Sequence, residues 1–286
     1  MDYKKGDKVK HPKQEAWGLG IVLEDQRDEK VRIFFENAGE KILSTKFFMP
    51  LIVTGAEAKH PVLDKLKANS KFLGLTILLN NFLLKFPNGF QDANFLEKEV
   101  YNKQSISDFA HEALNEAIFT QLLAQEAYAE IAHVIKSIVH KDTFSMIDRF
   151  EKIALVESLE DKRFQKLFAY SLYDLIYGKA DDFDKNFMEF AYVLTEMKAS
   201  KWTVMTYFLF IFHPQKHIFL KPTVTQNIAK ICEFNLHYET VLNIVTYHHV
   251  LKFANYLLKN LKELGLTPED MVDVQSFMWV VEKYQS

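Results

Sequence analysis

The chain has 286 residues, of which 48% are hydrophobic and 14% aromatic, and its formal net charge is −3. This apolar content excludes a disordered chain, and the length predicts one large domain or two unequal ones. Without a basic excess, any contact with nucleic acid has to come from a local patch. The single cysteine, Cys232, excludes internal disulfides and suits a reducing compartment.

The first residues run directly into charged residues without an apolar stretch, so no signal peptide is expected. No segment is long and apolar enough to span a bilayer. We therefore expect a cytoplasmic protein without a membrane partner. The usage of Lys, Phe and Asn is typical of bacterial proteins.

Residues 1–55 have the pattern of a small β module. Short apolar or alternating runs at 7–10, 17–24, 31–36 and 40–43 are separated by polar or glycine-containing turns. Four or five short strands in this length predict a small SH3-like β-barrel. The residues expected to be exposed on it are Lys8, Lys10, His11, Lys13, Trp17, Arg32 and Lys41. The alternative is that Trp17 belongs to the core and the lysines are solvated, because acids are interleaved with them.

Residues 54–61 form a linker, after which apolar residues recur at helical spacing. Residues 56–286 are therefore expected to form one all-α domain, and the fold class is mainly α. The helices predicted from the pattern are 62–86, 107–125, 128–139, 144–159, 162–177, 184–197, 201–212, 224–234, 238–264 and 268–284.

The segment 200–234 is the strongest candidate for a functional site. The apolar run Trp202–Phe212 fits a buried helix and is followed by a short extended piece. Lys221 then precedes a helix whose predicted start, Thr223–Gln226, has the spacing of a capping box.

Lys221 has three possible roles. The positive end of the helix dipole and burial behind Phe219 and Leu220 both disfavour its charge, which suits an imine-forming nucleophile. The same position supports phosphate binding together with the first N–H groups of the helix. The third possibility is a lysine that extends to solvent. Further lysines that could follow a phosphate backbone, or simply be solvated, are Lys198, Lys201, Lys252, Lys259 and Lys262.

The second candidate is the C-terminal segment 267–279. Thr267 is expected to cap its helix and Pro268 to start it, with Asp270 in a structural role. Asp273 and Gln275 lie off the expected core stripe. Asp273 could activate water or pair with Lys221, and Gln275 could read a base edge. The alternative is an exposed acid and amide.

Neither a cofactor nor a metal is expected, since dinucleotide, Walker and HExxH motifs are lacking. His213 and His217 flank the central loop, but no carboxylate or cysteine lies close to them in sequence, which disfavours zinc.

The segments GDKVKHP, WGLGIV and VRIFFENAGEKIL resemble the SH3/Tudor-like modules of CarD-type transcription regulators and of Rep/UvrD-type DNA helicase tails. This resemblance covers the first module only. It implies docking onto a protein or a nucleic acid and no catalysis by the module.

The order of buried helix, extended entry and helix is similar to the core of helix-hairpin-helix DNA glycosylases. KASKW (198–202) falls where the hairpin ends, and HIFLKPTVTQNIAK falls on the entry that carries their catalytic aspartate. Here the Gly-x-Gly hairpin is missing and Lys221 holds the aspartate position. Lys201 falls within about a residue of the lysine nucleophile of bifunctional members. FPNGFQDANFLEKE, FLKPTVT and DMVDVQSFMW also look like a bacterial family of largely unassigned proteins, for which we suspect a link to the antiphage glycosylases that excise modified cytosines.

The resemblance implies a glycosylase that flips a modified base, such as glucosylated hydroxymethylcytosine, out of double-stranded DNA in antiphage defence or repair. The expected catalytic residues are Lys221, Asp273 and Lys201. The expected DNA contacts are Lys8, Lys10, Lys13, Trp17, Lys198, Thr223, Thr225, Gln226, Asn227, Lys252, Lys259 and Gln275. The rival hypothesis is a non-catalytic DNA- or protein-binding module that docks through its barrel, and a third is a small-molecule binder. An apolar patch on the barrel would favour protein docking.

Overall fold

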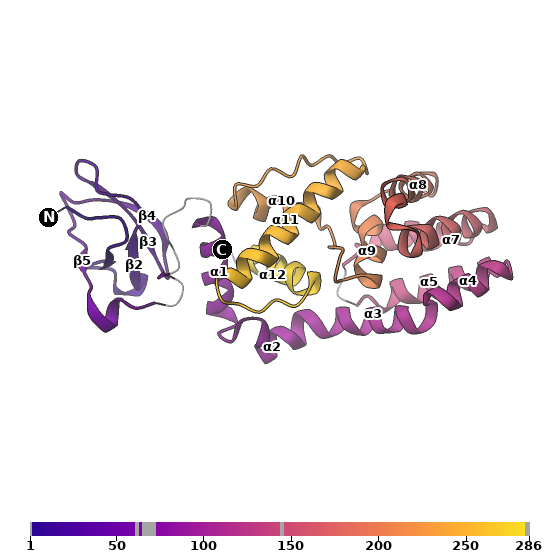
Figure 1. The fold of residues 1–286 in the computed structure, drawn as a ribbon, viewed down its shortest axis with the longest axis horizontal. Coiled ribbons are helices and arrows are strands. Elements are labelled where there is room, and N and C mark those ends of the chain that lie inside the picture. The colour runs from indigo at the N-terminus through magenta and orange to yellow at the C-terminus, as the bar shows by residue number, and fades with distance from the viewer. Residues whose placement is uncertain (1, 61–62, 65–72, 144–145, 284–286) are drawn as a thin grey trace. The chain divides into compact units, whose positions relative to one another are not determined.

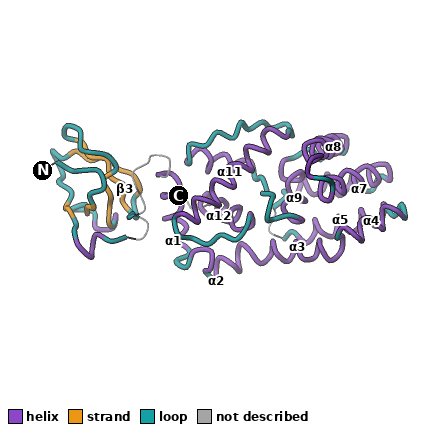
Figure 2. The backbone as a smooth tube through the Cα atoms, in the orientation of Figure 1, coloured by secondary structure: helices purple, strands orange, loops and turns teal. Residues whose placement is uncertain are grey.

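A computed structural model describes residues 2–60, 63–64, 73–143 and 146–283 (Figure 1). Small antiparallel β structure at the N-terminus is followed by helices, so the prediction of a mainly α chain with a small N-terminal β module is confirmed (Figure 2). The chain forms two compact units. The first comprises residues up to Pro87 with Ile231–Glu233, and the second comprises Asn88–Lys230 and Phe234–Lys283. The division that the sequence suggested, between residues 55 and 56, stays a prediction.

The β module is one five-stranded antiparallel sheet with the order β4-β3-β2-β1-β5. The strands are β1 (Lys8–Lys10), β2 (Leu19–Val22), β3 (Lys30–Phe35), β4 (Gly39–Ser44) and β5 (Leu51–Ile52). The β3–β4 hairpin closes where Phe35 pairs with Gly39, whose φ of 66° suits glycine at a tight turn. Buried apolar residues pack on both faces of the sheet, Val9 and Ile33 in one cluster and Ile21 and Phe34 in the other.

The first unit also contains two short 3₁₀ helices, η1 (Glu15–Trp17) and η2 (Gly55–Ala58), and helix α1 (Leu73–Lys85). The side-chain amide of Asn80 on α1 donates to the Glu36 carbonyl, which connects the helix to the end of β3. The helix predicted from residue 62 is described only from Leu73, and residues 62 and 65–72 of that prediction lie outside the described residues.

The second unit is helical. Its elements are η4 (Gly89–Gln91), α2 (Ala93–Phe95), the π-helical turn η5 (Leu96–Val100), α3 (Tyr101–Leu114), α4 (Glu116–Ala124), α5 (Tyr128–Lys141), α6 (Arg149–Ser158), α7 (Lys162–Tyr177), η6 (Ala180–Asp182), α8 (Phe183–Glu196), α9 (Trp202–Phe212), α10 (Pro222–Ile231), α11 (Ile244–Glu263) and α12 (Met271–Lys283).

Side-chain caps set several helix starts. Asp148 begins α6 with a full capping box, and Asp161 and Asn243 cap α7 and α11. The single helix predicted for 107–125 is wrong. Asn115 leaves helical geometry and its side chain accepts the Ile118 N–H at 3.1 Å, so the segment is two helices, α3 and α4.

Helix α9 is the centre of the second unit. All eleven of its residues are buried, as the apolar run predicted, and it packs against α3, α6, α7 and α8. The two threonines in the run each make a specific bond. Thr203 donates to the Glu151 carboxylate at 2.6 Å, and Thr206 donates to the Trp202 carbonyl at 2.7 Å. These hydroxyls are satisfied without water inside an otherwise apolar helix.

Helix α11 begins at Ile244 and not at residue 238, and two further predicted helix starts, next to the candidate residues, are also corrected. The Thr225 N–H donates to the Lys221 carbonyl, so α10 begins at Pro222, and the Thr223–Gln226 capping box does not form. Proline suits this first position because its missing N–H would have had no helical partner. Similarly, Asp270 accepts the Val272 N–H at 2.7 Å, so α12 begins at Met271 and not at residue 268.

Candidate functional site

Lys221 lies directly before α10, as predicted. The preceding backbone is fixed because the Leu220 N–H donates to the Thr206 hydroxyl of α9 at 2.9 Å. The half-buried Lys221 side chain extends to the Met146 carbonyl, to which Nζ donates at 3.0 Å. The ammonium is therefore held by a backbone acceptor from the segment between α5 and α6.

The segment that receives Lys221 is held by a buried acid. The Asp142 side chain is 0% exposed and pairs with Lys152 at 2.8 Å. Its two oxygens also accept the N–H groups of Met146 and Ile147, both at 3.2 Å. Asp142 thus orders the backbone carbonyl that binds Lys221.

Asp273 and Gln275 are buried in the structure, which corrects the expectation of a position off the core stripe. Asp273 lies in the first turn of α12, where its Oδ2 accepts the Glu269 N–H at 2.8 Å. Burial raises the pKa of Asp273 to about 6, although that hydrogen bond opposes the shift. The Oε1 of Gln275 is buried and has no hydrogen-bond partner among the residues described here.

A buried lysine that sequence reasoning missed lies beside this acid. Lys103 of α3 is only 7% exposed. Its Nζ donates to the Ser276 hydroxyl of α12 at 3.0 Å and to the Glu99 carbonyl, and it lies 3.8 Å from the Glu99 carboxylate. Burial lowers the pKa of Lys103 to about 8, against the opposing attraction of Glu99, Asp142 and Asp273. An amine with this pKa is about one-tenth neutral at pH 7.

The π-helical turn η5 contributes to this site. Glu99 lies within it, and the Glu99 carbonyl accepts both from Lys103 and from the Ser276 hydroxyl, the latter at 3.1 Å. Single π-turns are often found at functional sites because they redirect side chains and carbonyls. We call Glu99, Lys103, Asp273 and Ser276 the α3–α12 polar cluster. It was missed because Lys103 has the helical spacing of an ordinary surface lysine.

The other predicted residues of the second unit lie at separate places. Thr225 is buried and its hydroxyl has no partner among the described residues, while Thr223 is exposed. Gln226 donates to the Pro222 carbonyl and Asn227 to the Glu282 carboxylate, each at 3.2 Å. The predicted surface lysines are all exposed: Lys198, Lys201, Lys252, Lys259 and Lys262. Lys259 pairs with Glu263 at 3.9 Å.

The predicted contact residues of the β module are largely satisfied within it. Lys8 and His11, expected to be exposed, are buried, and Lys8 pairs with Asp64. Lys10 lies 3.7 Å from Glu57. Trp17 is partly buried and its ring lies 5.2 Å from that of Phe35, so it belongs to the core edge. The Nζ of Lys13 lies 5.6 Å from the Phe48 ring centre and that of Lys41 lies 5.8 Å from the Trp17 ring centre.

The exposed residues of this module that stand out are apolar. We call them the 42–52 patch: Ile42 (66% exposed), Phe47 (76%), Met49 (55%), Leu51 (58%) and Ile52 (44%). Ile42 lies on β4, and Leu51 and Ile52 lie on β5, which are the two edge strands of the sheet.

The two central histidines have other partners. His213 Nε2 lies 2.8 Å from the Ile176 carbonyl, and His217 Nδ1 lies 3.2 Å from the Tyr247 hydroxyl. Within the described ranges, no group of three or more His, Cys, Asp and Glu side chains is arranged to hold a metal ion. None of the helices in those ranges is both long and apolar enough to cross a membrane.

A change of pH should reveal the burial of Asp273. Its raised pKa means that the neutral acid favours the folded state, and this contribution is lost as the pH rises through about 6. The free energy of unfolding should thus fall by up to about 3 kcal/mol between pH 4 and 7 on account of this group. In urea titrations, Asp273→Asn should gain stability relative to the wild type as the pH rises. A difference between the two proteins that does not vary with pH would contradict this assignment.

Comparisons with known proteins bear on the β module alone. A family model described as a protein of unknown function (DUF3553) matches residues 3–51, which span β1 to the start of β5. No curated protein and no solved structure matches the chain.

Proposed function

We propose that the helical part is a DNA glycosylase that excises a modified base, and that Lys103 and Asp273 are its reacting groups. The observation that supports this proposal is a buried amine and a buried acid whose pKa values are moved toward each other, to about 8 and about 6. Active sites are where burial brings acids and amines to such values, because both protonation states are then accessible near neutral pH. The resemblance of segments 198–202 and 217–230 to helix-hairpin-helix glycosylases points to the same reaction.

In the proposed reaction the neutral amine of Lys103 attacks C1′ of the target nucleotide. A bond forms between Nζ and C1′, while the glycosidic bond breaks and the base leaves with the bonding electrons. The protonated form of Asp273 gives the departing base its proton, and the resulting carboxylate accepts a proton from the attached nitrogen. Opening of the sugar ring then gives an imine, which water hydrolyses to release the abasic site and the free amine.

Other residues take supporting roles in this proposal. Gln275 Oε1 would accept from an amino group on the flipped base, since it has no partner among the described residues. The exposed Lys198, Lys201, Lys252 and Lys259 would contact phosphates of double-stranded DNA. The sequence placed Lys221 at the aspartate position of the family. In this proposal Lys221 contributes to DNA binding, and its ammonium is bound to the Met146 carbonyl. No cofactor is needed for this chemistry.

The test is formation of abasic sites. Purified protein is incubated with duplexes that contain cytosine, hydroxymethylcytosine or glucosylated hydroxymethylcytosine, and abasic sites are cleaved with alkali and counted. The proposal expects cleavage at the modified base and a covalent protein–DNA adduct when borohydride reduces the imine. If no duplex yields abasic sites, the enzymatic function is wrong. If they form without an adduct, the nucleophilic role of lysine is wrong.

A second candidate function rests on the 42–52 patch. The β module resembles SH3/Tudor-like modules that dock onto proteins or nucleic acids, and its lysines at 8 and 10 are paired with acids while its apolar side chains are exposed. This combination favours a protein partner, such as a polymerase or a helicase, over DNA for this module.

Replacing Phe47 tests the docking function. Phe47 is the most exposed member of the patch, and loss of an aromatic anchor should weaken binding at least about tenfold. The measurement is the affinity of purified bacterial RNA polymerase and of a Rep-type helicase for wild type and Phe47→Asp. Phe150→Asp is the matched control, because Phe150 is 78% exposed on α6. Equal loss in both variants, or no binding of either partner by the wild type, would rule out docking through this patch onto these partners.

A further inference from the structure

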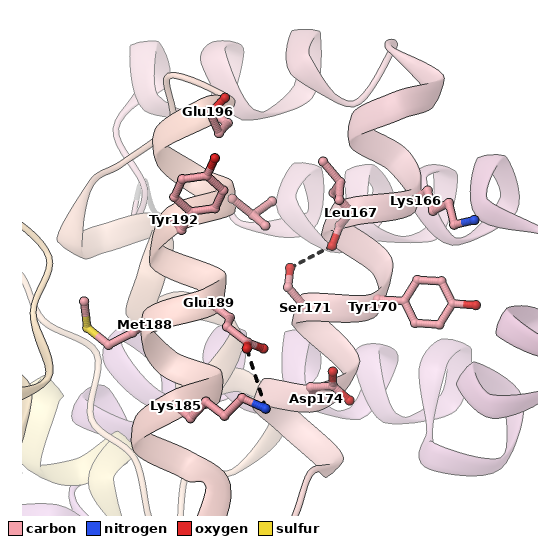
Figure 3. Close-up of a pocket in the computed structure, with 11 residues that line it drawn as sticks. Lys166, Leu167, Tyr170, Ser171, Asp174, Lys185, Met188, Glu189, Tyr192 and Glu196 are labelled. Carbon is pink, nitrogen blue, oxygen red and sulfur yellow. Dashed lines mark hydrogen bonds and ion pairs between the residues drawn. The ribbon is translucent and has the colours of Figure 1, made fainter.

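The surface between α7 and α8 contains a groove of roughly 580 Å³ that neither the polar cluster nor the 42–52 patch includes (Figure 3). The two helices pack closely along their length and belong to the same unit. The residues that line the groove are Lys166, Leu167, Tyr170, Ser171, Asp174, Lys185, Met188, Glu189, Tyr192, Val193 and Glu196.

One end of the groove carries exposed apolar side chains beside Glu196. Tyr192 is 65% exposed, and Leu167, on the facing turn of α7, is 45% exposed. Figure 3 shows both side chains at the same end, with the Tyr192 ring standing up from α8. Met188 is 42% exposed on the outer side of α8. Large apolar side chains left in water along a groove are typical of surfaces that bind a partner.

The other end is acidic. Asp174 of α7 and Glu189 of α8 face each other there, and one ammonium, that of Lys185, lies 3.7 Å from Glu189 (Figure 3). Burial and the charge of Glu189 raise the pKa of Asp174, although Lys185 opposes the shift. Two carboxylates against one ammonium leave this end with an excess negative charge, and a further cation placed there would relieve the repulsion between the acids.

We propose that the α7–α8 groove binds an amphipathic helix of a partner protein, with a basic side chain at Asp174 and an apolar side chain between Leu167 and Tyr192. Charge complementarity selects this occupant, because the acidic end disfavours nucleic acid and attracts lysine or arginine. Leu167 and Asp174 are seven residues apart on α7, which corresponds to about 10 Å. The partner helix should therefore carry its basic and apolar anchors two turns apart.

The probe is a fluorescent alanine-based helical peptide of about 16 residues. Two versions of this peptide each carry one lysine and one leucine seven positions apart. The lysine comes first in one version, and the leucine comes first in the other. A third peptide has glutamate in place of lysine, and a fourth has the two anchors two positions apart, on different faces. Anisotropy with the full chain should show binding of a lysine peptide below about 1 mM and at least about tenfold weaker binding of the glutamate and the misplaced peptides.

Variants of the chain locate the site. Asp174→Asn and Tyr192→Ala should each weaken binding of the lysine peptide about tenfold. Asp108→Asn and Tyr101→Ala, which change exposed residues on α3, should not. The proposal is overturned if neither lysine peptide binds, if the glutamate peptide binds equally well, or if the two groove variants bind like the wild type. Concentration-dependent dimers that Tyr192→Ala dissociates would assign the groove to a second copy of the chain and also overturn it.

Discussion

Replacing Lys103 by methionine is expected to abolish borohydride trapping and to lower base excision by at least about a thousandfold, because the side chain supplies the attacking nitrogen. Methionine keeps an unbranched apolar stem of similar length, which suits a residue that is 7% exposed. The wild-type rate should be highest between about pH 6 and 8. Below this range the neutral amine is lost, and above it the neutral acid of Asp273 is lost.

Lys221→Met and Lys201→Met are the discriminating comparisons. If the nucleophile is Lys103, the Lys221 and Lys201 variants should still form the trapped adduct, with weaker DNA binding as their main defect. If Lys103→Met forms the adduct and Lys221→Met does not, the nucleophile is Lys221, as the sequence suggested. Lys179→Met, which removes an exposed lysine outside the proposed DNA contacts, controls for loss of one exposed positive charge. Circular dichroism and the unfolding midpoint show that each variant is folded.

Replacing Asp142 by alanine is expected to lower the free energy of unfolding by about 3–5 kcal/mol. The Asp142 carboxylate is fully buried, pairs with Lys152 and accepts two backbone N–H groups. Its removal leaves the partly buried ammonium and both donors without that acceptor. The change should also release the Met146 carbonyl from its fixed position and so weaken the hold on Lys221.

Glu160→Gln is the matched control for this stability measurement. Glu160 pairs with Lys136 at 2.6 Å, but it is 69% exposed, so the loss should be less than about 1 kcal/mol. Urea denaturation of both variants gives the two values. Equal effects would show that Asp142 has no more than the role of a surface ion pair.

The sequence predicted the fold class because apolar periodicity is set by local geometry. The run Trp202–Phe212 is apolar on every side, and it forms the buried α9. Helix ends were predicted less well. The helices α4, α10 and α12 begin directly after Asn115, Lys221 and Asp270. A short polar side chain or a following proline can start a helix at any of several adjacent positions, so the sequence does not single out one of them.

The candidate site could be predicted only in part. Asp273 and Lys221 were identified from their places near helix starts, which are local features. Lys103 and Ser276 are 173 residues apart in sequence and meet only where the folded chain brings α3 beside the middle of α12. Asp273 was placed off the core stripe because the sequence suggested one apolar face, whereas tertiary packing buries α12 on nearly every side, Asp273 and Gln275 included.

The enclosure of α9 has a consequence for biosynthesis. Its eleven buried residues are covered by helices that precede it and also by later segments, because the Trp202 indole donates to the Glu239 carbonyl. A nascent chain that has emerged only as far as Phe212 lacks those later segments. It therefore presents this helix incompletely covered on the ribosome, where chaperones bind exposed apolar stretches until the C-terminal helices arrive.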